Sequence, residues 1–472
     1  MTATSEISRD RKGLRRPRAI GILVAAVLVV GLTYVAGAVR PVSPSVAPAG
    51  HASTIGSPAG DAGTLGAPAG AAVEPGPGSI EQIDQSIKAW AANLAAEPRD
   101  FISATSLATL YYARGRLSGD LSDQQRALES ARTAVRIAPT EPGGRALEAA
   151  ILYTLHDFSG ALAAAAALYR DDPSQLGALA TMADAKLELG RIDDARSDFG
   201  KLATLASGSA VDVRFARLAF VTGKADEALR LATSARDAAL TEAKTGGTPD
   251  LGFFEYAVGE YARLAGDSVT ARSGYAAAIA ARDTDIGAIV GLARIDANEG
   301  RTAAAVAGLR KAAAIAPQPE TLGLLGDLLA ASGDAAGAKA QYETVRFIER
   351  LGEIGSTVFD RVLLRFELDH GGASDALLAR ARASLAGRPD TTGHDAVAWA
   401  LYRLGRYDEA AAEITAAAAD GAADARLTFH RGAIALAHGD AVAGRAALER
   451  ALASGPALDP IEHAEAERLL GQ

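Results

Sequence analysis

Cysteine is absent from the chain, and this absence excludes several kinds of chemistry at once. Without a thiol there is no disulfide, no cysteine-ligated zinc, no thiol nucleophile and no lipobox-type lipid anchor. Aromatic residues are also scarce, at 5% of the chain, whereas hydrophobic residues make up 49%. The interior must therefore pack mainly on alanine, leucine and valine. The length of 472 residues exceeds what a single compact core usually needs.

Catalytic and cofactor-binding motifs are missing as well. The patterns H-E-x-x-H, G-x-G-x-x-G and G-x-x-x-x-G-K-[ST] do not occur. The seven histidines are dispersed, and we expect His430 and His438, eight residues apart, at the surface or in loops rather than at a metal. We therefore predict no enzymatic activity, no catalytic residue, no metal, no cofactor and no small-molecule substrate.

Charge is unevenly distributed along the chain. Six of the first 18 residues are basic and two are acidic, so this tail carries +4, whereas the whole chain carries −9. The remainder therefore has a net charge of −13. Because phosphate binding needs a basic face, this acidic body argues against nucleic acid as a partner.

An uncharged segment of 21 residues follows the basic tail, from Ala19 to Val39 (AIGILVAAVLVVGLTYVAGAV). As a helix it spans roughly 30 Å, the thickness of the hydrocarbon core of a bilayer. The basic flank keeps residues 1–18 in the cytoplasm. We therefore predict a single-pass signal anchor at 19–39 in the cytoplasmic (inner) membrane, with the rest of the chain extracytoplasmic. Ala36-Gly37-Ala38 also fits a cleavage site, so a secreted form is the alternative.

Two segments connect the hydrophobic run to the main body of the chain. Residues 40–78 are dominated by Pro, Gly, Ala and Ser and show no apolar period, which predicts a linker. Residues 79–98 carry Ile83, Ile87, Trp90 and Leu94 on one stripe, which predicts an amphipathic capping helix.

A helix-breaking residue then recurs at nearly constant spacing. The successive intervals in sequence number are 34, 33, 43, 34, 33, 38, 34 and 34. A period of roughly 34 residues is typical of a solenoid built from helical hairpins. The positions are His156, Gly190, Gly223, Gly266, Gly300, Gly333, Gly371, Gly405 and Gly439.

Small residues recur in register with these turns. Two antiparallel helices need small side chains where they cross closely. Seventeen of the eighteen residues in two columns are Ala or Gly. Seven residues before the turn these are Ala149, Ala183, Ala216, Gly259, Ala293, Gly326, Leu364, Ala398 and Gly432; five after it they are Ala161, Ala195, Ala228, Ala271, Ala305, Ala338, Ala376, Ala410 and Gly444.

At these residues the chain resembles the tetratricopeptide repeat (TPR) family. The family pattern has a small residue in the first helix, Gly at the turn followed by an aromatic or aliphatic residue, Ala early in the second helix and a bulky residue four later. One unit matches with Ala398, Gly405, Tyr407, Ala410 and Ile414. Another matches with Ala183, Gly190, Ile192, Ala195 and Phe199. The resemblance covers about Arg99 to Pro456 and most of the chain.

The resemblance implies an all-α fold, a right-handed α-solenoid of about nine to ten TPR-like hairpins. Its first helices would line a concave groove that holds peptides or partner helices. We assign residues 99–456 to the repeats and 457–472 to a C-terminal capping helix. The Gly371 unit departs from the pattern with Leu364 at the small position, and the interval of 43 marks an insertion at Thr241–Asp250.

The residue six positions before each turn residue is the one that we expect to face the groove. We call the set of these equivalent residues the charge column. From Asp184 to Arg365 its charges alternate, which places opposite charges on neighbouring first helices. These form either inter-repeat ion pairs or a polar stripe that sets the register of a partner. The clamp of Lys, Arg and Asn that some family members use for a free acidic C-terminus is not found in successive first helices. The column reads Asp184, Arg217, Glu260, Arg294, Asp327, Arg365 and Trp399.

Aromatic residues gather near the C-terminal end of the expected groove. Trp399, Tyr402 and Phe429 form either a contact site for a partner or a buried interface with the cap. We therefore expect a membrane-anchored, non-enzymatic scaffold whose partners are other proteins. The alternatives are a secreted repeat protein, a structural spacer without a specific partner, and a repeat appendage of an envelope enzyme. The Ala- and Gly-rich composition is typical of a high-GC bacterium.

Overall fold

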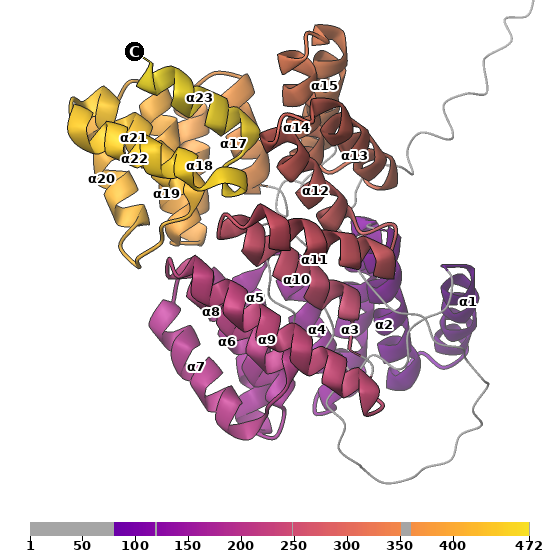
Figure 1. Ribbon diagram of the computed structural model, residues 1–472. Helices are drawn as coiled ribbons and strands as arrows, with labels where there is room; N and C mark the ends of the chain where they lie inside the picture. The colour runs from indigo at the N-terminus through magenta and orange to yellow at the C-terminus, as the bar shows by residue number, and fades with distance from the viewer. Residues whose placement is uncertain (1–79, 119, 248, 351–359, 472) are drawn as a thin grey trace, which may run out of the picture.

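The fold is all-helical in the part of the chain that the computed structural model describes (Figure 1). The described residues are 80–118, 120–247, 249–350 and 360–471, and they form 22 α-helices and one 3₁₀ helix, η1 (Gly455–Ala457), without a strand. The segments predicted as tail, membrane helix and linker (1–18, 19–39 and 40–78) lie outside these residues. Within the described residues, none of the helices is both long and apolar enough to cross a membrane.

Twenty of the helices form ten successive hairpins, so the predicted α-solenoid is confirmed. In each hairpin the first helix packs on the second, and in most hairpins it also packs on the first helix of a neighbouring unit. α9 is the longest helix because the start of the predicted insertion, Thr241 to Lys244, continues it. The hairpins are α2 (Phe101–Ser118) with α3 (Leu121–Ile137), α4 (Pro142–Thr154) with α5 (Phe158–Asp171), α6 (Leu176–Glu188) with α7 (Ile192–Leu205), α8 (Ser209–Val221) with α9 (Ala225–Lys244), α10 (Leu251–Leu264) with α11 (Ser268–Ala281), α12 (Ile286–Asn298) with α13 (Thr302–Ile315), α14 (Pro319–Ala331) with α15 (Ala335–Arg350), α17 (Asp360–His370) with α18 (Asp375–Gly387), α19 (Thr391–Arg403) with α20 (Tyr407–Ala417), and α21 (Ala425–His438) with α22 (Ala441–Ala453). α1 (Ile80–Ala96) precedes the first hairpin and α23 (Pro460–Leu470) follows the last.

Eight of the nine predicted turn residues end the first helices in the left-handed conformation. Gly405, for example, has φ = 74°, and His156, at φ = 60°, is the one non-glycine with positive φ among the described residues. Side-chain caps then start several second helices. Asp157 accepts from the backbone N–H of Gly160, and Asp267 from those of Val269 and Thr270. The turn and the cap together fix the sharp reversal of the chain.

The small residues do lie where paired helices cross. The column positions in eight of the nine units are buried alanines or glycines, with the Gly371 unit as the exception. An ideal Cβ on Gly274 of α11 would lie 2.6 Å from the backbone N of Gly259 in α10. Larger side chains at these positions would force the helices apart, which explains why the chain is rich in alanine.

The Gly371 unit is built differently from its prediction. Gly372 rather than Gly371 has positive φ, at 85°, and α18 begins at Asp375 after the Ser374 cap. The loop is therefore longer than in the other units, and Ala376, predicted at the helix crossing, is exposed. Leu364 and Leu378 are buried between the helices in place of small residues.

The solenoid returns onto itself through three loops of its C-terminal half. We call these loops the clasp: residues 388–390 before α19, 421–424 before α21, and 454–459 between α22 and α23. Each lies against the turn ends of hairpins far away in sequence. A Cβ on Gly190 would overlap the carbonyl oxygen of Pro389, and a Cβ on Gly223 would overlap that of Gly421.

Polar contacts join the last clasp loop to α10 and α12. The Arg263 guanidinium donates to the carbonyl oxygens of Pro456 and Ala457, at 3.1 and 3.4 Å. Arg294 donates to Asp459 at 2.6 Å, across 165 positions of sequence. The clasp closes the concave side of the middle repeats and thereby creates enclosed space.

Candidate binding site on the concave face

Two adjoining cavities lie between the first helices and the clasp. The clasp cavity has a volume of about 240 Å³ and lies among α8, α10, α17, α19, α21 and the clasp loops. The C-terminal cavity has about 540 Å³ and is bounded by α12, α14, α17, α19, α21 and α23. Arg365, Trp399 and His430 belong to the walls of both. Of the described hairpins, only the first helices contribute to the lining, as the resemblance implied.

The clasp cavity is lined by more cations than anions. Its walls contain the side chains of seven arginines but only four carboxylates, Glu320, Asp395, Asp424 and Asp459. The carboxylates that pair with Arg263, Arg361 and Arg388, namely Glu260 and Asp390, lie outside this lining. The arginines are Arg217, Arg263, Arg294, Arg361, Arg365, Arg388 and Arg426.

Arg263 illustrates how a cation is held at this surface. Its Nη2 donates to Glu260 at 2.5 Å, and both side chains are almost fully buried. Burial alone would lower the pKa of Arg263, but the attraction of Glu260 outweighs burial and the net pKa is raised. Burial likewise acts to raise the pKa of Glu260, and Arg263 reverses this to a net decrease. Both groups are therefore charged at neutral pH.

Ion pairs and hydrogen bonds connect neighbouring first helices along the concave face. Arg294 of α12 donates to Glu320 of α14 at 2.6 Å, and Asp327 of α14 accepts from His370 of α17 at 2.7 Å. The series continues with Asp369 to Trp399 and Asp395 to His430. Pairing between repeats is thus present, but none of these pairs joins two residues of the predicted column.

The predicted column splits into buried and cavity-lining residues. Asp184 and Glu260 are 3% and 4% exposed and are not part of either lining, so they cannot form an open polar stripe. Burial, opposed by the bound Arg214, raises the pKa of Asp184 to about 7. The remaining charged members do reach the cavities: Arg217 lines the clasp cavity, Asp327 the C-terminal cavity, and Arg294 and Arg365 both.

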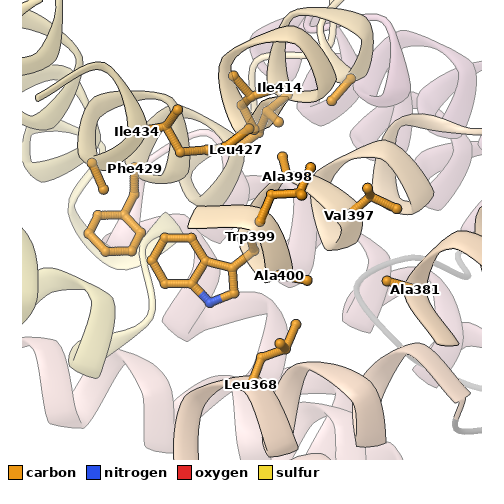
Figure 2. Close-up of a cluster of buried hydrophobic side chains, with 14 of the residues drawn as sticks. Leu368, Ala381, Val397, Ala398, Trp399, Ala400, Ile414, Leu427, Phe429 and Ile434 are labelled. Atoms are coloured by element: carbon orange, nitrogen blue, oxygen red, sulfur yellow. The ribbon is translucent and has the colours of Figure 1, made fainter. Parts of the chain in front are cut away.

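The predicted aromatic group is brought together, and it is both core and cavity wall. Trp399 stacks on Tyr402 with ring centroids 4.8 Å apart and lies 5.8 Å from Phe429. Figure 2 shows the indole beside the ring of Phe429, with Leu368 below it. Trp399 is only 6% exposed and belongs to the largest hydrophobic cluster of the C-terminal repeats. The two interpretations of this group, contact site and buried interface, therefore apply to the same residues.

Arg361, Arg388, Arg426 and His430 are among the lining residues that were not predicted. Arg388 belongs to a clasp loop, and its guanidinium lies 5.2 Å from the ring centroid of Phe158. His430 was expected at the surface or in a loop, but it is buried on α21. These residues do not recur at equivalent positions of successive repeats, because the clasp that brings them together joins non-adjacent repeats.

The site has no metal-binding character in the described part of the chain. There, no group of three or more His, Asp or Glu side chains is placed to hold a metal ion. The chemistry that the described side chains offer is reversible binding by charge, hydrogen bonds and aromatic surface.

Comparisons with known proteins give structural similarity alone. No family model matches the chain, and no curated protein sequence matches it. Among solved structures, human IFIT1 in complex with PPP-AAAA is 15% identical over 66% of this chain and 72% of its own, with a TM-score of 0.44. PilW, a type IV pilus biogenesis factor, is 18% identical over 55% of this chain and 98% of its own, with a TM-score of 0.30. A tetratricopeptide repeat protein from Parabacteroides merdae ATCC 43184 is 16% identical over 56% of this chain and 99% of its own, again with a TM-score of 0.30.

Proposed function

We propose that the protein is a non-enzymatic scaffold that receives a polypeptide segment of a partner protein in the two cavities of its concave face. The observation that carries this proposal is the enclosed space between the first helices and the clasp, lined by guanidinium groups and by Trp399. Ligand sites of this kind combine apolar and aromatic walls with a few polar groups that fix orientation.

We further propose that residues 19–39 anchor the scaffold in the cytoplasmic membrane and that the repeats work on the extracytoplasmic side. The support is the uncharged run of 21 residues after a basic tail. Immunoblots of membrane and medium fractions with a C-terminal tag test this location. A shortened product in the medium would support the secreted alternative instead.

Site-specific photocrosslinking in cells tests the binding function. Val362 lies in the walls of both cavities, so a photoreactive amino acid at this position should capture the partner. Val442, 84% exposed on the second helix α22, is the matched control. A discrete adduct from position 362 that is absent at 442 supports the proposal. The absence of any adduct specific to 362 would favour a structural spacer.

A further inference from the structure

We infer that the clasp cavity binds an anionic group, namely the carboxylate of an acidic side chain in the segment that the partner inserts. This inference rests on the proposed function and adds the chemical character of the bound segment. It follows from the excess of cations over anions in the lining of the cavity.

Several of the carboxylates that pair with the cavity arginines do not belong to the cavity wall. Glu260 holds Arg263 from within α10, and Asp390 is shared by Arg361 and Arg388, at 2.5 and 2.7 Å. Glu260 and Asp390 are not part of the cavity wall. Glu320 and Asp459, which pair with Arg294, do belong to the wall, so the excess of cations there comes from the other arginines.

Arg365 is the least compensated of these cations. Its carboxylate neighbour, Glu320, lies 3.7 Å away and is already held at 2.6 Å by Arg294. Arg365 also stands where the two cavities adjoin. Because a guanidinium can bind a carboxylate through two parallel hydrogen bonds, Arg365 offers a ready partner for an incoming acidic group.

The cavity walls strengthen this attraction. Trp399, Leu368 and Phe220 provide apolar surface between the arginines. Electrostatic interactions in such a partly desolvated space are stronger than those at an open surface. The C-terminal cavity next to it has five arginines and six carboxylates in its lining, together with Phe366, Tyr402 and Phe429. It suits the apolar residues that flank the acidic one.

The dimensions and charges favour a polypeptide over a nucleic acid. A nucleic acid brings one negative charge per nucleotide, which the body of the chain, at −13, repels outside the small cavity. An acidic side chain on a polypeptide needs only a local positive site. The missing clamp in successive first helices does not oppose this, because the arginines come from non-adjacent repeats and from a clasp loop.

Tryptophan fluorescence of the full-length chain in detergent tests the inference. The chain has two tryptophans, so Trp90→Phe leaves Trp399 as the sole reporter in the cavity wall. The probes are acetylated and amidated tetraglutamate, the matching tetraglutamine, pyrophosphate and a hexanucleotide. We expect saturable binding of tetraglutamate that weakens with salt, and no comparable binding of tetraglutamine.

Arg365→Gln and Arg310→Gln form the decisive pair of variants. Arg310 is exposed on the second helix α13, away from both cavities. Arg365→Gln should weaken tetraglutamate binding about tenfold, and Arg310→Gln should leave it unchanged. Equal binding by the two variants, or equal binding of tetraglutamine, would overturn the inference. Tighter binding of pyrophosphate or of the hexanucleotide than of tetraglutamate would overturn the assignment to a carboxylate.

Competition separates this inference from the proposed function. Tetraglutamate should reduce the adduct formed from position 362. A partner adduct that tetraglutamate does not reduce would refute the acidic ligand while the scaffold function stands. If position 362 yields no partner at all, the scaffold function itself fails, whatever the probes bind.

Discussion

The indole of Trp399 stacks on the imidazole of His430, with ring centroids 4.0 Å apart and ring planes 13° from parallel. A carboxylate on the preceding first helix holds each ring: Trp399 Nε1 donates to Asp369 and His430 Nδ1 contacts Asp395. The two rings thereby join the last three hairpins while forming part of both cavity walls. Stability and binding are consequently coupled in this part of the molecule.

Replacing Trp399 by alanine should therefore lower the free energy of unfolding of the C-terminal repeats, so that a loss of binding in this variant could not be assigned to the binding site alone. Removal of a large buried aromatic side chain costs about 3–5 kcal/mol. Tyr407→Ala is the control, because Tyr407 is 39% exposed and surface substitutions typically change stability by about 0.5 kcal/mol or less. Urea denaturation followed by circular dichroism measures both. Similar losses for the two variants would contradict the burial of Trp399.

The pair of His430 and Asp395 should make stability depend on pH. Burial acts to lower the pKa of His430, but the attraction of Asp395 outweighs it, so the pKa is raised above the ordinary 6.5. A raised pKa in the folded state stabilises the fold fully below pH 6.5, and this contribution is lost as the pH rises through the raised value. Glu462 adds to the increase and Arg426 opposes it.

His430→Gln should accordingly flatten this decline in the free energy of unfolding between about pH 6 and pH 8. His463→Gln serves as the control, because His463 lies on α23 with only Glu467, 4.0 Å away, as its charged partner. Urea titrations at half-unit pH intervals compare the slopes. A slope in His430→Gln as steep as in the unaltered chain would show that another group causes the pH dependence.

Arg294 should control whether the clasp stays closed. It bridges Glu320 of α14 and Asp459 of the clasp, each at 2.6 Å, and is buried. Removing one partner of a buried ion pair typically costs about 3–5 kcal/mol. We expect Arg294→Ala to speed amide hydrogen exchange in residues 454–459 and in α23. Arg272→Gln, which breaks more exposed pairs with Asp296 and Glu299, should not do so.

The repeat register was predictable from the sequence because it depends on local rules. A left-handed turn residue and a small residue at each crossing are needed in every hairpin, so both signals recur once in each repeat. Gly405 and Ala410 show both signals where they were predicted. The prediction for the Gly371 unit was wrong because one extra loop residue moved the turn to Gly372.

The site was less predictable, because its contacts do not follow the repeat period. A strict column predicts pairs between residues that are one full repeat apart. The observed pairs instead bridge 26 positions for Arg294 and Glu320, 30 for Asp184 and Arg214, and 43 for Asp327 and His370. Long side chains reach one or two turns along a neighbouring helix, so the charged residues of the column pair with residues outside it.

The clasp was beyond prediction for a different reason. Its contacts join loops to helices and turns of distant repeats, across as many as 165 or 194 positions, and several of them use backbone atoms, which have no sequence signature. Closure depends on the accumulated curvature of all the intervening hairpins. The pattern in a single sequence specifies each hairpin, but it does not specify the total curvature of the solenoid.

Two turn glycines allow the clasp contact to be tested separately from backbone strain. Gly223 and Gly405 have nearly the same positive φ, 77° and 74°. A left-handed alanine costs about 1–2 kcal/mol at either position. A Cβ on Gly223 would also overlap the carbonyl oxygen of Gly421 in the clasp, whereas a Cβ on Gly405 would meet no other described atom within 4 Å.

Gly223→Ala should therefore lose more stability than Gly405→Ala, by about 1–3 kcal/mol, the usual penalty for overpacking. It should also speed hydrogen exchange at residues 421–424, which Gly405→Ala leaves protected. Thermal unfolding and exchange of the two full-length variants provide the comparison. Equal loss of stability with unchanged exchange at 421–424 would mean that the clasp is open in solution, and the clasp cavity would then not exist as a binding site.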